Sequence, residues 1–182
     1  LADLGERKFS TEMWNETTSQ HDGTLKRDTR FPAVPGSLIL QGPHVYVGNP
    51  LFKTPRAVCD TNRAYDPVDL STLPADYLPR TNYIPACQDA SYQARTPRCP
   101  WEPHPPVTGL YRLVHRGMLS QPGERTLVSA IVPPGVGHIH GLQSTAFAEF
   151  GDLVAATAIS VSVPADFFIK STGRANLHYL WL

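Results

Sequence analysis

The chain has 182 residues with a formal net charge of +0, so it fits one domain with a real core and lacks a global electrostatic attraction to nucleic acid. Three cysteines form an odd, sparse set, which excludes a secreted disulfide framework. No apolar run approaches the roughly 20 residues of a bilayer span, and the sequence contains no signal-peptide pattern, so we expect a cytoplasmic protein.

The first part of the chain is polar and only weakly periodic. We therefore expect an N-terminal arm over residues 1–35 and a single α+β domain over residues 36–182, with a small mixed or antiparallel sheet flanked by short helices. Two short β segments are expected at residues 37–41 and 44–47. A Gly-Pro pair separates them, because proline has no backbone N–H to donate to a β ladder. Because the sequence begins with Leu1 rather than Met, we expect a segment of a longer protein.

Residues 42–56, GPHVYVGNPLFKTPR, combine an extended run with the turn formers Gly-Asn-Pro. The pattern predicts a strand running into a loop that displays Lys53 and Arg56 beside the aromatic ring of Phe52. Cations and an aromatic face suit a phosphate backbone and stacked bases. A plain strand and turn with a solvated basic flank fits the same pattern, and composition alone does not decide between the two.

Residues 73–106 are rich in proline and tyrosine, which predicts an ordered loop laid over the domain surface and fastened by its tyrosines. Within it, residues 88–95 are a short helical candidate. From residue 108 to 121, apolar residues follow the spacing of one buried helical stripe, which predicts an amphipathic helix. The stripe consists of Leu110, Leu113, Val114 and Met118.

The C-terminal third predicts a sheet strand followed by short helices. The apolar run at residues 125–132 is typical of an interior strand. The glycine-bracketed segment GHIHG then predicts a loop with His138 and His140 on one side of an extended chain. A short helix is expected at residues 144–150.

Two further helices are expected after that one. Residues 152–160 are apolar nearly all round, which indicates a buried helix, with a strand as the alternative. Residues 162–169 begin with Ser-Val-Pro, a helix start, and this helix would bring Lys170 to Arg174 to the surface.

Common catalytic signatures are absent. Cys59, Cys87 and Cys99 stand 28 and 12 positions apart, which does not match a zinc-binding pair, and the two histidines of GHIHG have no acidic or cysteine partner at ligand spacing. The chain has no Gly-x-Ser-x-Gly elbow and no glycine-rich phosphate loop. We therefore expect no metal, no nucleophile and no bound cofactor in this chain.

One short segment resembles a catalytic loop. Asn49-Pro50-Leu51-Phe52 is similar to the Asn-Pro-Pro-Tyr/Phe loop with which amino-group DNA methyltransferases hold a flipped base. Leu51 replaces the second proline, and no glycine-rich turn for S-adenosylmethionine precedes the segment. A catalytic fragment that uses Asn49 and Phe52 therefore remains one alternative function.

Four segments resemble one family. They are WNETTSQHDGTLKRDTRFP, GPHVYVGNPLFKTPR, YRLVHRGMLSQPGERTLVSAIVPPGVGHIHG and VPADFFIKSTGRANL. Together they look like the C-terminal part of large single-chain adenine-specific DNA methyltransferases of the Type IIG restriction-modification and phage-defence class. The resemblance covers most of residues 10–178. Its most specific part, ERTLVSAIVPPG with DFFIKSTGR, is similar to the core of their target-recognition domains.

The resemblance implies a DNA specificity region whose methyltransferase domain, with its S-adenosylmethionine, lies upstream in the same polypeptide of a bacterial parent protein. ERTLVSAIVPPG would form the central strand, and FFIKSTGR would present its polar residues to double-stranded DNA. The DNA-contact candidates are Lys53, Arg56, Lys170, Ser171, Thr172 and Arg174, with Asn49, His138 and His140 as further base-edge candidates. A protein-protein interaction module, using the tyrosine-rich middle, is the other alternative.

Overall fold

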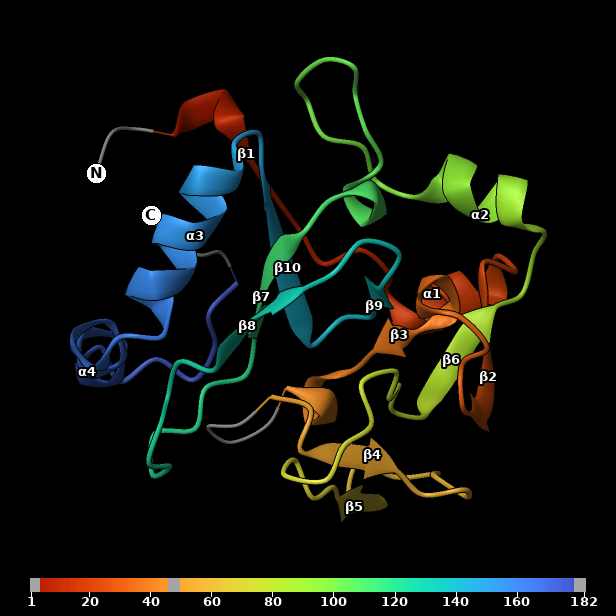
Figure 1. Ribbon diagram of the computed structural model, residues 1–182, viewed down its shortest axis with the longest axis horizontal. Coiled ribbons are helices and arrows are strands. Elements are labelled where there is room, and N and C mark those ends of the chain that lie inside the picture. Colours follow the sequence, from red (N-terminus) through yellow and green to blue (C-terminus); the bar gives the residue numbers. More distant parts are fainter. Residues whose placement is uncertain (1–3, 46–49, 179–182) are drawn as a thin grey trace.

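The structure is a computed structural model that describes residues 4–45 and 50–178. Its centre is a four-stranded antiparallel sheet (Figure 1). The strands follow the order β1 (Lys8–Thr11), β10 (Leu142–Phe147), β7 (Arg112–Arg116) and β8 (Ser129–Val132). β1 pairs with β10, so the N-terminal segment joins strands from the C-terminal half of the chain in one sheet.

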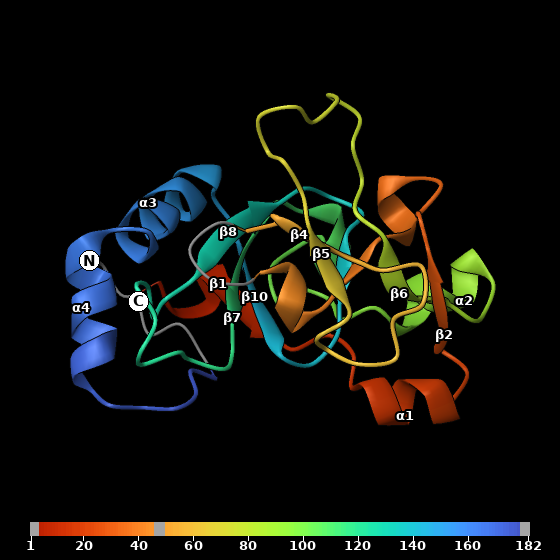
Figure 2. The same ribbon diagram turned by 90° about the horizontal axis from the view of Figure 1, so that it is seen from below.

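Three two-stranded pairs form the other small sheets in the part of the chain that the structure describes. Two are antiparallel and one is parallel. They are β2 (Leu25–Arg30) with β6 (Thr81–Pro85), β4 (Lys53–Pro55) with β5 (Tyr65–Pro67), and the parallel pair β3 (Ile39–Leu40) with β9 (Gly137–His138). Figures 1 and 2 both place these pairs on one side of the main sheet.

Within residues 4–45 and 50–178, four α-helices lie around the sheets. They are α1 (Glu16–His21), α2 (Asp89–Arg95), α3 (Phe150–Ser160) and α4 (Val163–Ser171), and single 3₁₀ turns occupy Gly5–Arg7, Pro35–Ser37, Gly42–His44 and Val107–Gly109. Ser162 caps α4 by accepting a hydrogen bond from the backbone nitrogen of Ala165 at 3.3 Å. α3 and α4 cover the face of the sheet opposite the small pairs (Figure 2).

The core has two main layers, one on each face of the central sheet. Leu113 of β7 packs with Leu153 of α3 and Ile169 of α4, whereas Val114 packs with Leu142 and the residues around β3. β7 is therefore buried on both faces. This two-sided burial positions the end of β7, where the candidate site lies.

The α+β class is confirmed, with small sheets that are mainly antiparallel. The predicted helices at residues 88–95, 152–160 and 162–169 are α2, α3 and α4. The predicted strand at residues 125–132 is shorter and lies at the edge of the sheet as β8, so its prediction as an interior strand was wrong.

The helix predicted at residues 108–121 was wrong, because this segment contains β7. Leu113, Val114 and His115 are all fully buried between two layers. A strand buried on both faces loses the alternation of polar and apolar residues, and its apolar residues can match a helical spacing by chance.

The helix predicted at residues 144–150 was also wrong, because β10 runs through most of it. Polar residues in this strand are buried and hydrogen-bonded across the sheet. Ser144 Oγ lies 2.8 Å from His138 Nε2, and the hydroxyls of Thr145 and Ser10 lie 2.9 Å apart. Sequence periodicity does not reveal a buried polar strand of this kind.

The segments predicted as arm and loop carry regular structure. Residues 1–35 contribute β1 to the main sheet as well as α1 and β2, and residues 73–106 contain β6 and α2. Tyr83 and Tyr92 are buried, in keeping with tyrosines that fasten this segment by packing. Trp14 Nε1 donates to Tyr92 Oη at 3.0 Å, which joins the two segments.

Candidate nucleic-acid interface

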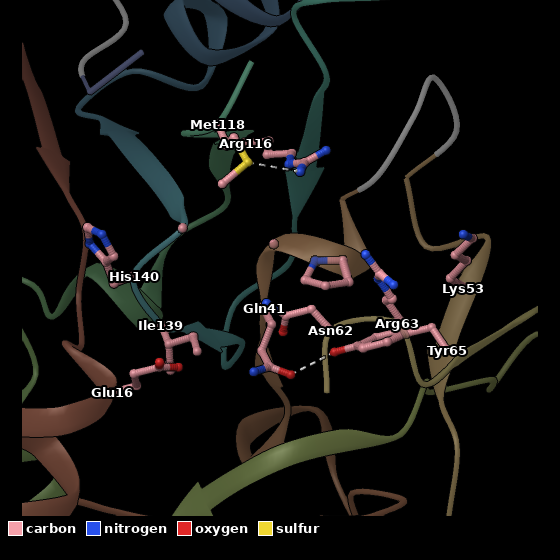
Figure 3. A pocket seen from close by; sticks show the side chains of 13 residues that line it. Glu16, Gln41, Lys53, Asn62, Arg63, Tyr65, Arg116, Met118, Ile139 and His140 are labelled. Carbon is pink, nitrogen blue, oxygen red and sulfur yellow. Dashed lines mark hydrogen bonds between the residues drawn. The ribbon is translucent and has the colours of Figure 1, made fainter. Parts of the chain in front are cut away.

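A cleft of about 540 Å³ opens between the end of β7, the β9–β10 turn and the β4–β5 pair (Figure 3). It brings together residues from six separate parts of the chain. The lining residues are Glu16, Gln41, Gly42, Pro43, Lys53, Asn62, Arg63, Tyr65, Arg116, Met118, Ile139, His140 and Gly141. Of the larger cavities, this one has the most polar and charged side chains, so we describe it as the candidate site.

Three permanent cations reach the cleft from three places. Lys53 begins β4, Arg63 lies in the connection between β4 and β5, and Arg116 ends β7. The antiparallel pairing of Lys53 with Pro67 fixes the hairpin that carries the first two. Lys53 Nζ lies 5.3 Å from the centre of the Phe52 ring, so the expected pairing of a cation with an aromatic face is present.

The floor of the cleft is a buried hydrogen-bonded group around Gln41. Its Oε1 accepts from Tyr65 Oη and from Asn82 Nδ2, each at 2.7 Å. Burial raises the pKa of the Tyr65 phenol, so this hydroxyl remains a donor at neutral pH. The carbonyl end of the Gln41 amide is therefore occupied inside the protein.

His44 fixes the backbone of the same residue. The backbone nitrogen of Gln41 donates to His44 Nδ1 at 3.0 Å, and His44 Nε2 lies 2.8 Å from the carbonyl oxygen of Arg80. An acceptor at Nδ1 and a donor at Nε2 define the neutral tautomer. Burial lowers the pKa of His44 to about 4, which keeps the ring neutral.

His140 lies on the opposite wall. Its Nδ1 is 2.9 Å from Glu12 Oε2, and Gln143 Nε2 donates to the other oxygen of this carboxylate at 3.0 Å. Partial burial alone would raise the pKa of Glu12, but the hydrogen bonds and charges around it, chiefly from His140, lower it below its usual value. The pair is exposed, so His140 remains accessible at the surface.

Two further cations, Lys170 and Arg174, lie beside the segment that follows β7. Met118 pairs with Asn176, and Gln121 Nε2 donates to the carbonyl oxygen of Arg174 at 2.6 Å. Lys170 Nζ donates to the carbonyl oxygen of Gly123 at 2.8 Å. The end of α4 is therefore tied to the segment that also carries Arg116.

The structure separates the predicted contact residues into several groups. Lys53 and His140 line the cleft, and Lys170 and Arg174 lie by the segment after β7. The hydroxyls of Ser171 and Thr172 are each 2.7 Å from a carbonyl oxygen of their own helix, so they are engaged locally. Asn49 lies outside the described residues.

Arg56 is neutralised by a neighbour, because its Nε donates to Asp66 Oδ1 at 2.8 Å across the β4–β5 pair. Four other arginines also form ion pairs with aspartates. These pairs are Arg7–Asp152, Arg30–Asp28, Arg95–Asp22 and Arg125–Asp166. In the part of the chain that the structure describes, each of these five arginines therefore has a carboxylate partner.

His138 is fully buried, so its assignment as a base contact was wrong. It pairs with Ser144, and the neighbouring Arg112 donates to the carbonyl oxygen of Val136. Burial, helped by the positive charge of Arg112, lowers the pKa of His138 to about 3. The two histidines of GHIHG do not share a face, because His138 enters the core in β9 and His140 emerges from it.

Sequence reasoning missed Arg63, Arg116 and Gln41. Arg63 ends the polar run Asp-Thr-Asn-Arg, which lies in the connection between β4 and β5. A cation in such a polar run was the signal that could have identified this residue. Arg116 was placed on a helix that does not exist. Gln41 looked like an ordinary strand residue, and only its partners from β5 and β6 show its role.

Among residues 4–45 and 50–178, no group of three or more His, Cys, Asp or Glu side chains could hold a metal ion. In the same part of the chain no single helix is long and apolar enough to cross a membrane, although α3 and α4 together, bent by 64°, meet the criteria of length and composition. Comparison with known proteins finds no matching family, no similar curated protein and no similar solved structure.

Proposed function

We propose that this chain is the DNA target-recognition region of an adenine-specific, S-adenosylmethionine-dependent DNA methyltransferase of a bacterial restriction-modification or phage-defence system. The observation that carries the proposal is the convergence of Lys53, Arg63 and Arg116 on one cleft. These cations come from separate segments of a chain with zero net charge. A local cluster of this kind is what binding to a phosphate backbone requires.

Double-stranded DNA would lie across the mouth of the cleft and along the segment after β7. Arg63 and Arg116 would contact phosphates at the cleft, while Lys170 and Arg174 would extend the contact toward the end of α4. The groups that read base edges would be the polar side chains between these cations, such as Asn62.

The methyl transfer would take place elsewhere in the parent protein, with S-adenosylmethionine bound by its methyltransferase domain. The outer face of α3 supports contact with another domain. Phe150, Val154 and Val161 recur at spacings of four and seven residues, so they share one face, and all three are exposed. Such an apolar stripe suits contact with an apolar surface on another domain. We propose that this partner is the catalytic domain of the parent protein.

The DNA proposal is tested by fluorescence anisotropy of a labelled duplex at several salt concentrations. We expect the affinity to fall steeply with salt, and the double variant Arg63→Ala/Arg116→Ala to reduce the slope of log K against log salt by about 2. Lys26→Ala/Arg98→Ala removes the same charge from exposed positions outside the cleft and is the matched control. Absent binding, or binding that does not depend on salt, would contradict the proposal.

The protein-interaction module is the second candidate, and the exposed apolar stripe of α3 favours it. Its predicted contact surface needs correction, because Tyr83 and Tyr92 of the middle segment are buried. A stable complex with a partner subunit that is unaffected both by DNA and by Arg63→Ala/Arg116→Ala would favour this candidate over DNA recognition.

The catalytic alternative, with Asn49 and Phe52 at a flipped base, stays a prediction. A calorimetric titration of this chain with S-adenosylmethionine is expected to give no heat of binding. Stoichiometric binding of the cofactor would favour a catalytic role for the chain itself.

A further inference from the structure

We propose that the cleft at Gln41 is a pocket for one unpaired nucleotide, with the base on the Gln41 amide and the phosphate between Arg63 and Arg116. This inference rests on the proposed DNA binding. It adds that one nucleotide of the bound DNA leaves the duplex and enters the cleft. The ligand is a nucleoside monophosphate unit, which a displaced DNA nucleotide and a free nucleotide would both supply. The source that we propose is a nucleotide displaced from a DNA duplex, rather than a free nucleotide.

The size of the cleft suits this ligand. Its volume is about 540 Å³, and pockets for small organic ligands range from roughly 300 to 1,000 Å³. A base with its sugar and phosphate fits such a volume, whereas a double helix does not. Duplex DNA across the mouth would therefore leave the interior of the cleft available to one nucleotide.

Gln41 provides a prepared hydrogen-bond donor. The side chain is 94% buried, with only 6% of its surface exposed. Because Oε1 already accepts from Tyr65 and Asn82, the amide is held in one orientation. Figure 3 shows its nitrogen on the side away from Tyr65, within the cleft. A donor fixed in this way selects a ligand with an acceptor, such as a carbonyl or ring nitrogen of a base.

The walls beside this donor are apolar. Pro43 and Ile139 line the cleft with Met118, whose side chain is largely exposed at its edge. Arg116 Nη2 lies 3.6 Å from Met118 Sδ, which places the guanidinium beside the apolar wall (Figure 3). Apolar side chains beside a polar group are the usual environment for the flat face of a base.

The charge balance favours a phosphate. Lys53, Arg63 and Arg116 face a single carboxylate in the lining, that of Glu16. This carboxylate accepts a hydrogen bond from Tyr83 Oη at 3.3 Å. Three cationic side chains and one carboxylate therefore line the cleft, and such a lining suits a phosphate better than an uncharged heterocycle.

The test compares two labelled duplexes, one fully paired and one identical except for a single unpaired adenine in a bulge. Displacing a paired base costs energy that an unpaired base does not require, so we expect about tenfold tighter binding of the bulged duplex. Gln41→Glu removes the amide donor while keeping an acceptor for Tyr65 and Asn82, and should abolish this preference. Arg63→Ala should weaken it, and Lys26→Ala should leave it unchanged.

The outcomes separate this inference from the proposed function. Equal affinity for both duplexes overturns the nucleotide pocket but leaves DNA binding intact, whereas no binding to either duplex at low salt overturns the proposed function. Tight binding of free deoxyadenosine monophosphate without a preference for the bulge also overturns the inference. If thermal unfolding shows that Gln41→Glu is unfolded, the exposed Arg63→Ala variant decides the question.

Discussion

Arg56, directly after β4, and Asp66 of β5 form an ion pair with Nε and Oδ1 2.8 Å apart, while Lys53 at the start of β4 lines the cleft. Two cations three residues apart therefore have different surroundings. The ion pair holds Arg56 on the hairpin. Lys53 is placed where DNA would lie.

The first prediction follows from this difference. Lys53→Ala should weaken duplex binding severalfold and reduce the salt slope by about 1, whereas Arg56→Ala should change affinity by less than about twofold. The Arg56–Asp66 side chains are 59% and 52% exposed, so breaking the pair should cost only about 0.2–1 kcal/mol of stability. Anisotropy and urea unfolding measure the two effects. A larger loss of binding from Arg56→Ala would show that its ion pair opens to DNA.

The second prediction concerns the end of α4. Lys170→Ala/Arg174→Ala should reduce the salt slope by about 1 to 2. The smaller value applies if Lys170 keeps its hydrogen bond to the Gly123 carbonyl in the complex. Ser171→Ala is the control, because its hydroxyl is bonded within the helix. An unchanged slope for the double variant would restrict the DNA contact to the cleft.

The third prediction is a loss of stability at mildly acidic pH. Burial lowers the pKa of His44 and His115 to about 4 and that of His138 to about 3. The unfolded chain binds these protons below a pKa of about 6.5, and the folded protein does so only below its lowered values. The stabilising contribution of these three neutral histidines is therefore fully present above about pH 6.5. It is lost as the pH falls from about 6.5 toward the lowered pKa values of the folded protein.

Between pH 7 and pH 5, the free energy of unfolding should fall by about 2 kcal/mol for each of these histidines. Urea unfolding at the two pH values measures it. His138→Gln should reduce this pH dependence by about one third, since one of three buried rings is removed, whatever its effect on absolute stability. A free energy of unfolding that does not change between pH 7 and pH 5 would contradict the buried neutral state.

The fourth prediction distinguishes the two faces of α3. Leu153→Ala, on the inner face, should destabilise the protein by about 2–5 kcal/mol because it leaves a cavity against the sheet. Phe150→Ser, at a position that is 63% exposed, should have a much smaller effect on stability and should reduce self-association of the isolated chain. Urea unfolding and sedimentation velocity measure these effects. A large destabilisation by Phe150→Ser would mean that its edge contact with Tyr111 supports the fold.

Local patterns in the sequence were sufficient for the helices α2, α3 and α4, because each has a start signal or an apolar run that acts within a few residues. Composition also indicated an α+β domain and the basic, aromatic character of the residues at Phe52 and Lys53. These features depend on side chains that are close in the sequence. They needed no information about the partner of each segment.

The tertiary structure decided the strands β7 and β10 and the membership of the candidate site. Leu113 and Val114 are in a strand because two layers bury both faces of it, and His138 is neutral because it lies in the core beside Arg112. Arg63 and Arg116 lie on one cleft only after the β4–β5 pair and the end of β7 are brought to the same place in the fold. Burial and long-range pairing depend on residues remote in the chain, so no local pattern of residues could specify them.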